Sequence, residues 1–195
     1  MGFATKKKTD GKFTLKDYAT WSDDERWEII GGEAYAMTPA PSIRHQEISL
    51  YLSGQFANFF RGRDCKPFHA PTDVVFDNQN IVQPDLLVIC DKSKITEANI
   101  QGVPDLVVEI LSPSTALKDK REKKDLYERF GVREYLIVYP MEELVERFVV
   151  ADGRYNAAEV FGWGETLPIA IFPELTLNLW EVFDKQLPQQ ETLEA

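Results

Sequence analysis

Cysteine is scarce in this chain, and long apolar runs are missing. Of 195 residues only Cys65 and Cys90 are cysteines, and they provide neither a disulfide framework nor zinc-finger spacing. We therefore expect two reduced, partly buried thiols in a cytoplasmic protein. No stretch approaches the roughly 20 apolar residues that cross a bilayer, and the basic N-terminus is not followed by the apolar segment of a secretory signal. These absences exclude a disulfide-stapled scaffold and a membrane partner.

Positive charge is also in short supply. Lysine and arginine number 22 against 32 acidic residues, which gives a net charge of −10. Such a balance argues against a protein that coats nucleic acid through bulk electrostatics, although a local basic patch can still serve a short contact. An apolar share of 44% is enough for a well-filled core. The length predicts a single domain over residues 1–195, with flexible ends at 1–12 and 187–195.

The order of the expected elements is that of a mixed α/β protein. Gly31-Gly32 can supply the positive φ angles of a hairpin turn, and Ser42 is a suitable N-cap for a helix. A strand, a crossover helix that ends at Gly131 and a second strand predict a right-handed parallel βαβ unit. The expected elements are a short helix at 13–20, a hairpin of 27–30 with 33–36, a helix at 42–60, strands at 72–76, 81–90 and 105–111, a helix at 116–130, a strand at 134–139 and a hairpin over 144–160.

Acidic residues interrupt two of the apolar strands. Glu109 lies within Leu-Val-Val-Glu-Ile-Leu, where a carboxylate is costly to bury unless it is paired, hydrogen-bonded or metal-bound, although a solvated face is the alternative. Asp105 is four residues away on the same strand, roughly 13 Å, which is too far to share one ion. Asp85 begins another strand, and neighbouring strands are about 4.8 Å apart. We therefore pair Asp85 with Glu109 as ligands of one Mg²⁺ and give Asp105 a turn or capping role.

Basic residues crowd the helix that follows Glu109. Asp119, Lys123 and Tyr127 recur at i, i+4 and i+8 and so share one face. An ion pair on a solvated helix is the simplest interpretation of this spacing. Leu126 and Phe130 nevertheless turn part of the helix toward the sheet, which favours a site role for Lys123. The basic residues of these turns are Lys118, Lys120, Arg121, Lys123 and Lys124.

Several segments together resemble a known family. The segments are Trp27-Glu-Ile-Ile-Gly-Gly-Glu, Pro41-Ser…His45, Gln83-Pro84-Asp85-Leu, Pro104-Asp-Leu-Val-Val-Glu109-Ile-Leu-Ser-Pro-Ser114, Asp119…Lys123…Tyr127 and Gly131-Val-Arg-Glu-Tyr. In this order the chain resembles the Uma-type family of predicted restriction endonucleases, a branch of the PD-(D/E)xK nuclease superfamily. The resemblance implies an α/β restriction-endonuclease-like core over 42–140: a mixed sheet flanked by helices (helix, three strands, helix, strand), with hairpins added at both ends.

The resemblance also implies roles for single residues. Asp85 matches the metal-binding aspartate of the PD motif, and Glu109 matches the acid of the second half-motif. Leu111 occupies the usual lysine position, so the lysine role shifts to the helix, to Lys123 or its neighbour Lys124. Asp119 and Tyr127 are supporting residues on that helix. His45 stands where other superfamily members place an acid on the first helix, and Glu47 competes for that place.

The activity implied by the resemblance is hydrolysis of phosphodiester bonds in nucleic acid, with DNA as the expected substrate. We expect an endonuclease that uses Mg²⁺, or Mn²⁺, and acts as a homodimer because two strands need two active sites. The basic turns after Glu109 would contact substrate phosphates. The alternatives are a phosphoesterase of small substrates and a catalytically inactive module for partner binding or assembly. The acidic surface and the aromatic-rich tail (Phe161, Trp163, Phe172, Trp180, Phe183) suit the inactive module.

Overall fold

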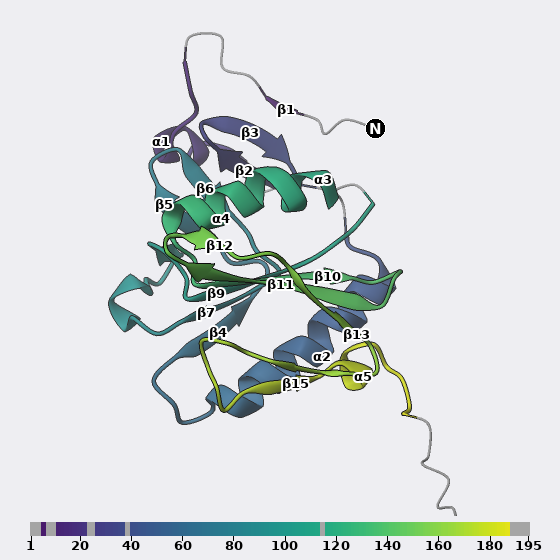
Figure 1. Cartoon of the computed structure of the whole chain (residues 1–195). Helices are drawn as coiled ribbons and strands as arrows, with labels where there is room; N and C mark the ends of the chain where they lie inside the picture. The colour runs from purple at the N-terminus through teal and green to yellow at the C-terminus, as the bar shows by residue number, and fades with distance from the viewer. Residues whose placement is uncertain (1–4, 7–10, 23–25, 38–39, 114–115, 188–195) are drawn as a thin grey trace, which may run out of the picture.

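Two mixed β-sheets form the centre of the molecule. In the computed structural model (Figure 1), residues 5–6, 11–22, 26–37, 40–113 and 116–187 are described. One sheet has six strands in the order β1-β3-β2-β6-β5-β8, and the other runs β12-β11-β10-β9-β7-β4, with β13 paired to β11. A third, two-stranded sheet joins β14 (Thr166–Pro168) to β15 (Thr176–Asn178).

The six-stranded sheet contains the predicted N-terminal hairpin. Gly31 and Gly32 adopt φ angles of 59° and 79°, which glycine tolerates because it lacks Cβ. They allow β2 to turn back along β3, with Trp27 opposite Ala36. The strands are β1 (Thr5–Lys6), β2 (Trp27–Ile30), β3 (Glu33–Ala36), β5 (Val74–Asp77), β6 (Asn80–Val82) and β8 (Ile100–Gln101).

The seven-stranded sheet contains the predicted βαβ unit. Strands β9 and β10 are parallel, with Glu109 opposite Ile137, and the helical segment 116–130 connects them. The other neighbours in this sheet pair antiparallel. Its strands are β4 (Lys66–His69), β7 (Leu86–Ile89), β9 (Leu106–Ile110), β10 (Glu134–Tyr139), β11 (Leu144–Ala151), β12 (Arg154–Tyr155) and β13 (Glu159–Gly162).

Helices cover both faces of the seven-stranded sheet. Ser42 caps α2 (Ile43–Phe60) by accepting a hydrogen bond from the His45 amide, as predicted, and Gly131 ends α4 (Lys124–Phe130) with a φ of 79°. The remaining helices are α1 (Leu15–Tyr18), η1 (Lys92–Lys94), α3 (Ala116–Lys118), the π-helical η2 (Asp119–Lys123) and α5 (Leu179–Val182). Among the described helices, none has the length and apolar character that a membrane span requires.

The side chains of the central strands alternate between two hydrophobic cores. Leu86 and Val108 pack with α2 on one face, whereas Leu87 and Val107 pack with α4 on the other. This period-two alternation is what a strand buried on both faces requires. The aromatic tail joins the α2 side: Phe183 is buried there, and Phe161, Trp163 and Phe172 pack against the same cluster. The tail therefore contributes mainly to the core.

The predicted strand over 81–90 is wrong in one respect, because it is two strands. β6 ends at Val82 and belongs to the six-stranded sheet, whereas β7 begins at Leu86 in the seven-stranded sheet. Pro84 lies between them, and proline has no N–H to donate to a ladder. The break at residues 83–85 carries the chain from one sheet to the other. It also leaves Asp85 at the start of β7.

The expectation of two free thiols is also wrong. Cys65 and Cys90 form a disulfide, with their Cα atoms 3.9 Å apart. Strands β4 and β7 are antiparallel with Lys66 opposite Ile89, so continuing the register by one residue brings the two cysteines face to face. The residue count alone did not reveal this pairing, because the strand register creates it. The ends expected to be flexible, residues 1–12 and 187–195, lie largely outside the described residues.

Candidate active site

The two acids selected from the sequence lie on neighbouring antiparallel strands. Leu86 of β7 is opposite Val108 of β9, so the next step of the register sets Asp85 opposite Glu109. Directly opposed residues share a face, with Cβ atoms about 5 Å apart. The Asp85 Oδ2 atom also accepts a hydrogen bond of 2.7 Å from the Ile110 amide, which ties the turn before β7 to β9. The sheet thus brings the pair together on one side.

Glu109 is nearly fully buried, with 3% of its surface exposed. Its Oε1 atom accepts a hydrogen bond of 2.6 Å from the Tyr127 hydroxyl and lies 2.8 Å from the Lys123 Nζ atom. Lys123 and Tyr127 come from η2 and α4, which cover this face of the sheet. The helix therefore supplies the lysine next to the acid, and the helical spacing observed in the sequence belongs to a buried face.

The lysine sits in a π-helical turn, η2, at the start of the crossover helix. Lys123 is 3% exposed, and its Nζ atom lies 3.8 Å from the Asp119 Oδ1 atom four residues earlier. Tyr135 of β10 fixes this turn by donating a hydrogen bond of 3.1 Å to the Asp119 carbonyl. Single π turns within α-helices recur at functional sites. The interpretation as a solvated ion pair is wrong, because both side chains are buried.

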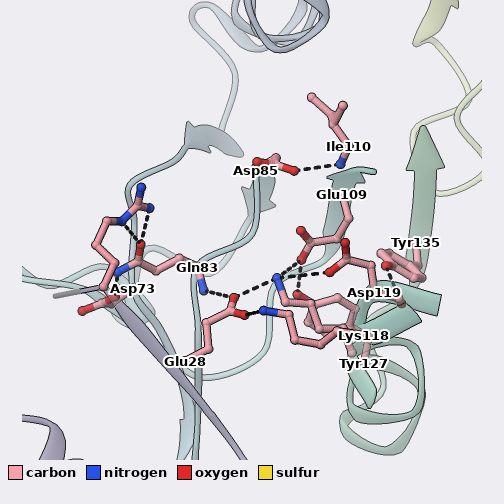
Figure 2. A network of polar contacts seen from close by, with 12 residues as sticks. Glu28, Asp73, Gln83, Asp85, Glu109, Ile110, Lys118, Asp119, Tyr127 and Tyr135 are labelled. Carbon is pink, nitrogen blue, oxygen red and sulfur yellow. Dashed lines mark hydrogen bonds and ion pairs between the residues drawn. The ribbon is translucent and has the colours of Figure 1, made fainter. Parts of the chain in front are cut away.

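Two further charged residues complete the cluster: Glu28, which was missed from the sequence, and Lys118, which was expected to contact substrate phosphates. Glu28 of β2 is fully buried; its Oε1 lies 2.8 Å from the Lys123 Nζ atom, and its Oε2 accepts a hydrogen bond from Lys118. Figure 2 shows the carboxylates of Glu28, Glu109 and Asp119 turned toward one another around these contacts. The signal was available: Glu28 interrupts the apolar run Trp-Glu-Ile-Ile as Glu109 interrupts its own strand.

His45 contacts Asp85 from the α2 side. Its Nε2 atom lies 3.3 Å from the Asp85 Oδ1 atom, and its Nδ1 atom is buried without a hydrogen-bond partner among the described residues. His45 is buried and therefore lies on the inner side of the first helix. The helix start is held in place by the Ser42 cap described above. His45 can orient Asp85, since a histidine N–H is a donor.

Three other residues named from the sequence lie outside the cluster. The Glu47 side chain is 47% exposed and pairs with Arg44 at 3.8 Å, so the structure does not bring this competing acid to the site. Lys124 contacts β11 instead of the cluster, with its ammonium 4.3 Å from the centre of the Phe148 ring. Asp105 accepts a hydrogen bond of 2.8 Å from the Cys90 amide, which matches the turn or capping role expected for it.

A cleft of about 730 Å³ opens above the cluster. It lies between the turn at 83–85, the start of α2 and the start of the crossover helix. The groups available at its wall include Arg26, which donates to the Gln83 side chain, and the exposed His69. The ionisable residues that line it are Arg26, Glu28, His45, His69, Asp85, Glu109, Lys118, Asp119 and Lys123. The candidate site is therefore reachable from solvent, although several of its groups are buried.

The carboxylates around Lys123 differ strongly in pKa. Burial raises the pKa of Glu109 to about 8; Lys123 opposes this effect, and the nearby acids, Asp119 first, add to it. Burial also acts to raise the pKa of Glu28, but Lys123 and Lys118 outweigh it and lower that pKa to about 2. The difference follows from the contacts, because Glu28 has two ammonium partners and Glu109 has one. Lys123 keeps its proton, since these acids hold its pKa well above the ordinary value against the effect of burial.

The cluster is short of positive charge. Four carboxylates face two ammonium groups, which leaves two negative charges in excess when these six groups are ionised and His45 is neutral. Burial lowers the pKa of His45, but its contact with Asp85 outweighs burial and raises that pKa, and a protonated His45 reduces the excess to one. The carboxylates are Glu28, Asp85, Glu109 and Asp119, and the ammonium groups are Lys118 and Lys123. A buried excess of negative charge is unfavourable in a low-dielectric site and is relieved by protonation or by a cation. The raised pKa of Glu109 shows that protonation relieves part of this excess in the metal-free site. A bound cation would relieve it in place of the proton.

The fold matches that of a solved protein. A crystal structure described as a putative nuclease belonging to DUF820 from Anabaena variabilis aligns with a TM-score of 0.73, over 88% of this chain and 98% of that chain. The two sequences are 20% identical, so the match shows the fold. The α/β restriction-endonuclease-like architecture expected from the sequence is confirmed by this match.

Two related sequences and one family model match this chain. An uncharacterized protein of Synechocystis is 34% identical over 131 residues, which cover 65% of this chain and 68% of the relative. A second uncharacterized Synechocystis protein is 27% identical over 143 residues, 71% of this chain and 80% of the relative. The family model named Uma2 and described as a putative restriction endonuclease matches residues 15–179, which include every residue of the cluster and all strands of the two larger sheets except β1. The chain belongs to the Uma2 family.

Proposed function

We propose that this protein hydrolyses phosphodiester bonds in nucleic acid, with DNA as the substrate and Mg²⁺, or Mn²⁺, as the cofactor. The observation that carries the proposal is the placement of Asp85 and Glu109 on opposed positions of adjacent strands, with Lys123 against Glu109. Their position at one cleft supports a shared task. The family description, a restriction endonuclease, supports a nucleic-acid substrate.

The donor set fits a hard divalent cation. Asp85 retains 20% of its side-chain surface, and Glu109 engages its protein partners through Oε1 alone among the contacts described. Within the described residues no three His, Cys, Asp or Glu side chains are placed to share an ion. Two carboxylates supplemented by waters and a backbone carbonyl suit Mg²⁺, which keeps several waters when bound. When bound, this ion would polarise the phosphate and acidify a water molecule.

Lys123 would act through its charge. Its raised pKa means that it stays protonated at neutral pH, so it cannot serve as a general base. An ammonium fixed beside Glu109 can instead stabilise the negative charge that develops on the phosphate. Tyr127 would hold Glu109 through its hydrogen bond of 2.6 Å, and His45 would orient Asp85. Asp119 would contribute by fixing the turn that carries Lys123.

Phosphate contacts would come from a different set of cations than the sequence indicated. Lys118 and Lys123 are buried in the cluster and cannot lie along a phosphate backbone. Lys120 and Arg121 remain exposed on the same turn, and Arg26 lines the cleft. With few exposed cations at the cleft and a net charge of −10, nucleic-acid binding should be weak. Its dependence on salt should be shallow, because the slope scales with the number of phosphates contacted.

The experiment is a cleavage assay with variants of the two acids. Purified protein is incubated with supercoiled plasmid and with labelled single-stranded DNA, duplex DNA and RNA, in Mg²⁺, in Mn²⁺ or in EDTA. We expect divalent-dependent cleavage that Asp85→Asn or Glu109→Gln reduces at least about 100-fold, because each removes a cation ligand. Cleavage at the wild-type rate by a protein that carries both Asp85→Asn and Glu109→Gln would refute the proposal.

A matched control is available on the first helix. Glu47→Gln removes the exposed acid that competed with His45 in the sequence, and it should leave cleavage unchanged. Loss of activity in this variant would instead assign the first-helix acid to the site. The substrate panel separates DNA from RNA, and a small phosphodiester such as bis(p-nitrophenyl) phosphate tests the alternative of a small-substrate phosphoesterase.

An inactive binding module is the competing function. The acidic balance of the chain favours it, whereas the packing of the aromatic tail in the core removes one reason for it. Calorimetric titration with Mg²⁺ separates the two functions: an enzyme should show binding that Asp85→Asn abolishes, and an inactive module should show none. We also propose a homodimer, since cutting both strands of a duplex needs two sites. Light scattering measures its mass.

A further inference from the structure

Glu28 is the acid of the cluster whose oxygens are most completely occupied. It is fully buried on β2, in the six-stranded sheet, whereas the candidate metal ligands belong to the seven-stranded sheet. Its Oε1 atom accepts a hydrogen bond of 3.0 Å from the Gln83 amide and contacts Lys123, and its Oε2 atom contacts Lys118. A carboxylate with an ammonium group against each of its oxygens is a poor ligand for a cation. Its effect must therefore pass through its neighbours.

The neighbour that matters is Lys123. Its Nζ atom lies 2.8 Å from the Glu28 Oε1 atom and 2.8 Å from the Glu109 Oε1 atom, so two sheets hold one ammonium between them. A lysine side chain has a flexible stem of four carbons and an ammonium that rotates freely. More than one partner is therefore needed to fix the position of the ammonium. The two contacts fix the direction of the ammonium and leave one of its three N–H donors for another acceptor.

Lys118 explains why Glu28 does not cancel the charge of Lys123. Lys118 is 2% exposed and contacts the opposite oxygen of Glu28, so the carboxylate is matched by its own ammonium group. Glu28 can then hold the Lys123 ammonium in place without neutralising it. The positive charge of Lys123 remains available to Glu109 and the cleft. Gln83, which follows β6, adds a backbone donor on the same side. The arrangement is visible in Figure 2, where Glu28 lies between Gln83 and Lys118.

We propose that Glu28 is a positioning residue that, together with Lys118, holds the Lys123 ammonium against Glu109 at the floor of the cleft. The hairpin of β2 and β3, outside the nuclease-like core expected at 42–140, is then part of the active site. Where the proposal concerns rates, it rests on the proposed nuclease function.

The kinetic test uses a pair of variants. Glu28→Gln keeps the shape of the side chain but removes the carboxylate that both buried ammonium groups contact, so it should destabilise the fold. Glu28→Gln combined with Lys118→Met also removes the buried ammonium that contacts Glu28 Oε2 and should recover stability. We expect this double variant to cleave about 10- to 100-fold more slowly with a nearly unchanged KM, because a displaced catalytic group costs rate. Lys92→Met, which removes an exposed lysine that does not line the cleft, is the control and should retain its rate.

The outcomes separate positioning from structural support. If Glu28 serves only the fold, the double variant should regain rate together with stability, and that result would overturn the proposal. If the double variant does not fold, Glu28→Asp decides: it keeps the charge but shortens the side chain, so a purely electrostatic role predicts full rate and positioning predicts loss.

A second readout needs no substrate. In a protein labelled with ¹⁵N-lysine, the ammonium protons of buried, hydrogen-bonded Lys123 should exchange slowly enough to give a resonance, assigned by its loss in Lys123→Met. We expect the exchange rate to rise at least about tenfold in the Glu28→Gln, Lys118→Met protein, because a neutral amide oxygen holds the ammonium more weakly than a carboxylate does. An unchanged rate would overturn the inference. The measurement remains decisive even if the protein cleaves no nucleic acid.

Discussion

Replacing Glu109 by glutamine should make the metal-free protein more stable at high pH while removing its proposed activity. Burial raises the pKa of Glu109 to about 8, so the metal-free folded protein holds this proton far more tightly than the unfolded chain does. Glutamine has nearly the same shape and stays neutral. Its amide oxygen can still accept from Lys123 and Tyr127, which now contact Oε1.

The sign and size follow from proton linkage. A carboxyl group whose folded pKa is raised stabilises the folded state fully only below its unfolded pKa, and that stability is lost as pH rises toward the folded value. One pH unit within this interval corresponds to about 1.4 kcal/mol. From the unfolded value of 4.5 to about 8 the loss is on the order of 5 kcal/mol. Glu109→Gln escapes this loss, so its stability relative to wild type should increase with pH.

The assay is urea unfolding in EDTA, followed by tryptophan fluorescence, at pH 6 and pH 8. We expect the free energy of unfolding of Glu109→Gln, relative to wild type, to rise by about 2 to 3 kcal/mol between the two pH values. Adding Mg²⁺ at pH 8 should stabilise wild type and not the variant, because a ligand stabilises only the protein that binds it. An equal stability difference at pH 6 and pH 8 would show that Glu109 is not a carboxyl of raised pKa.

Two further predictions concern the lysine and the disulfide. Lys123→Met should lower kcat by about 100- to 1,000-fold, as the loss of one charge-stabilising donor does, whereas Lys124→Met should stay within about twofold, because its ammonium lies over Phe148. Equal losses in single-turnover rates of the two variants would contradict the assignment of Lys123. Reducing the Cys65–Cys90 disulfide should lower the free energy of unfolding by about 3 to 4 kcal/mol, since it closes a loop with a sequence separation of 25. Urea unfolding with and without reductant measures this loss, and a count of two free thiols in the untreated protein would exclude the bond.

Features that depend on neighbouring residues could be predicted from the sequence. Gly31-Gly32 specified the hairpin, Ser42 specified the start of α2 and Gly131 specified the end of α4, because each acts through the backbone of its own turn. The pairing of Asp85 with Glu109 was also accessible, since an acid in an apolar strand demands a partner and adjacent strands are close. The helical spacing of Lys123 and Tyr127 placed both on the face that meets Glu109.

Only the tertiary structure decided which distant segments meet. The register of β4 against β7 joins Cys65 to Cys90, and the two-sheet arrangement brings Glu28 of β2 to Lys123 of the crossover helix. The physical reason is that local patterns specify the conformation of a segment and which of its faces is buried. The choice of partner depends on the packing of all segments together. The break at Pro84 illustrates the difference: its residue type indicates an interruption, but the second sheet that receives the chain is a property of the whole fold.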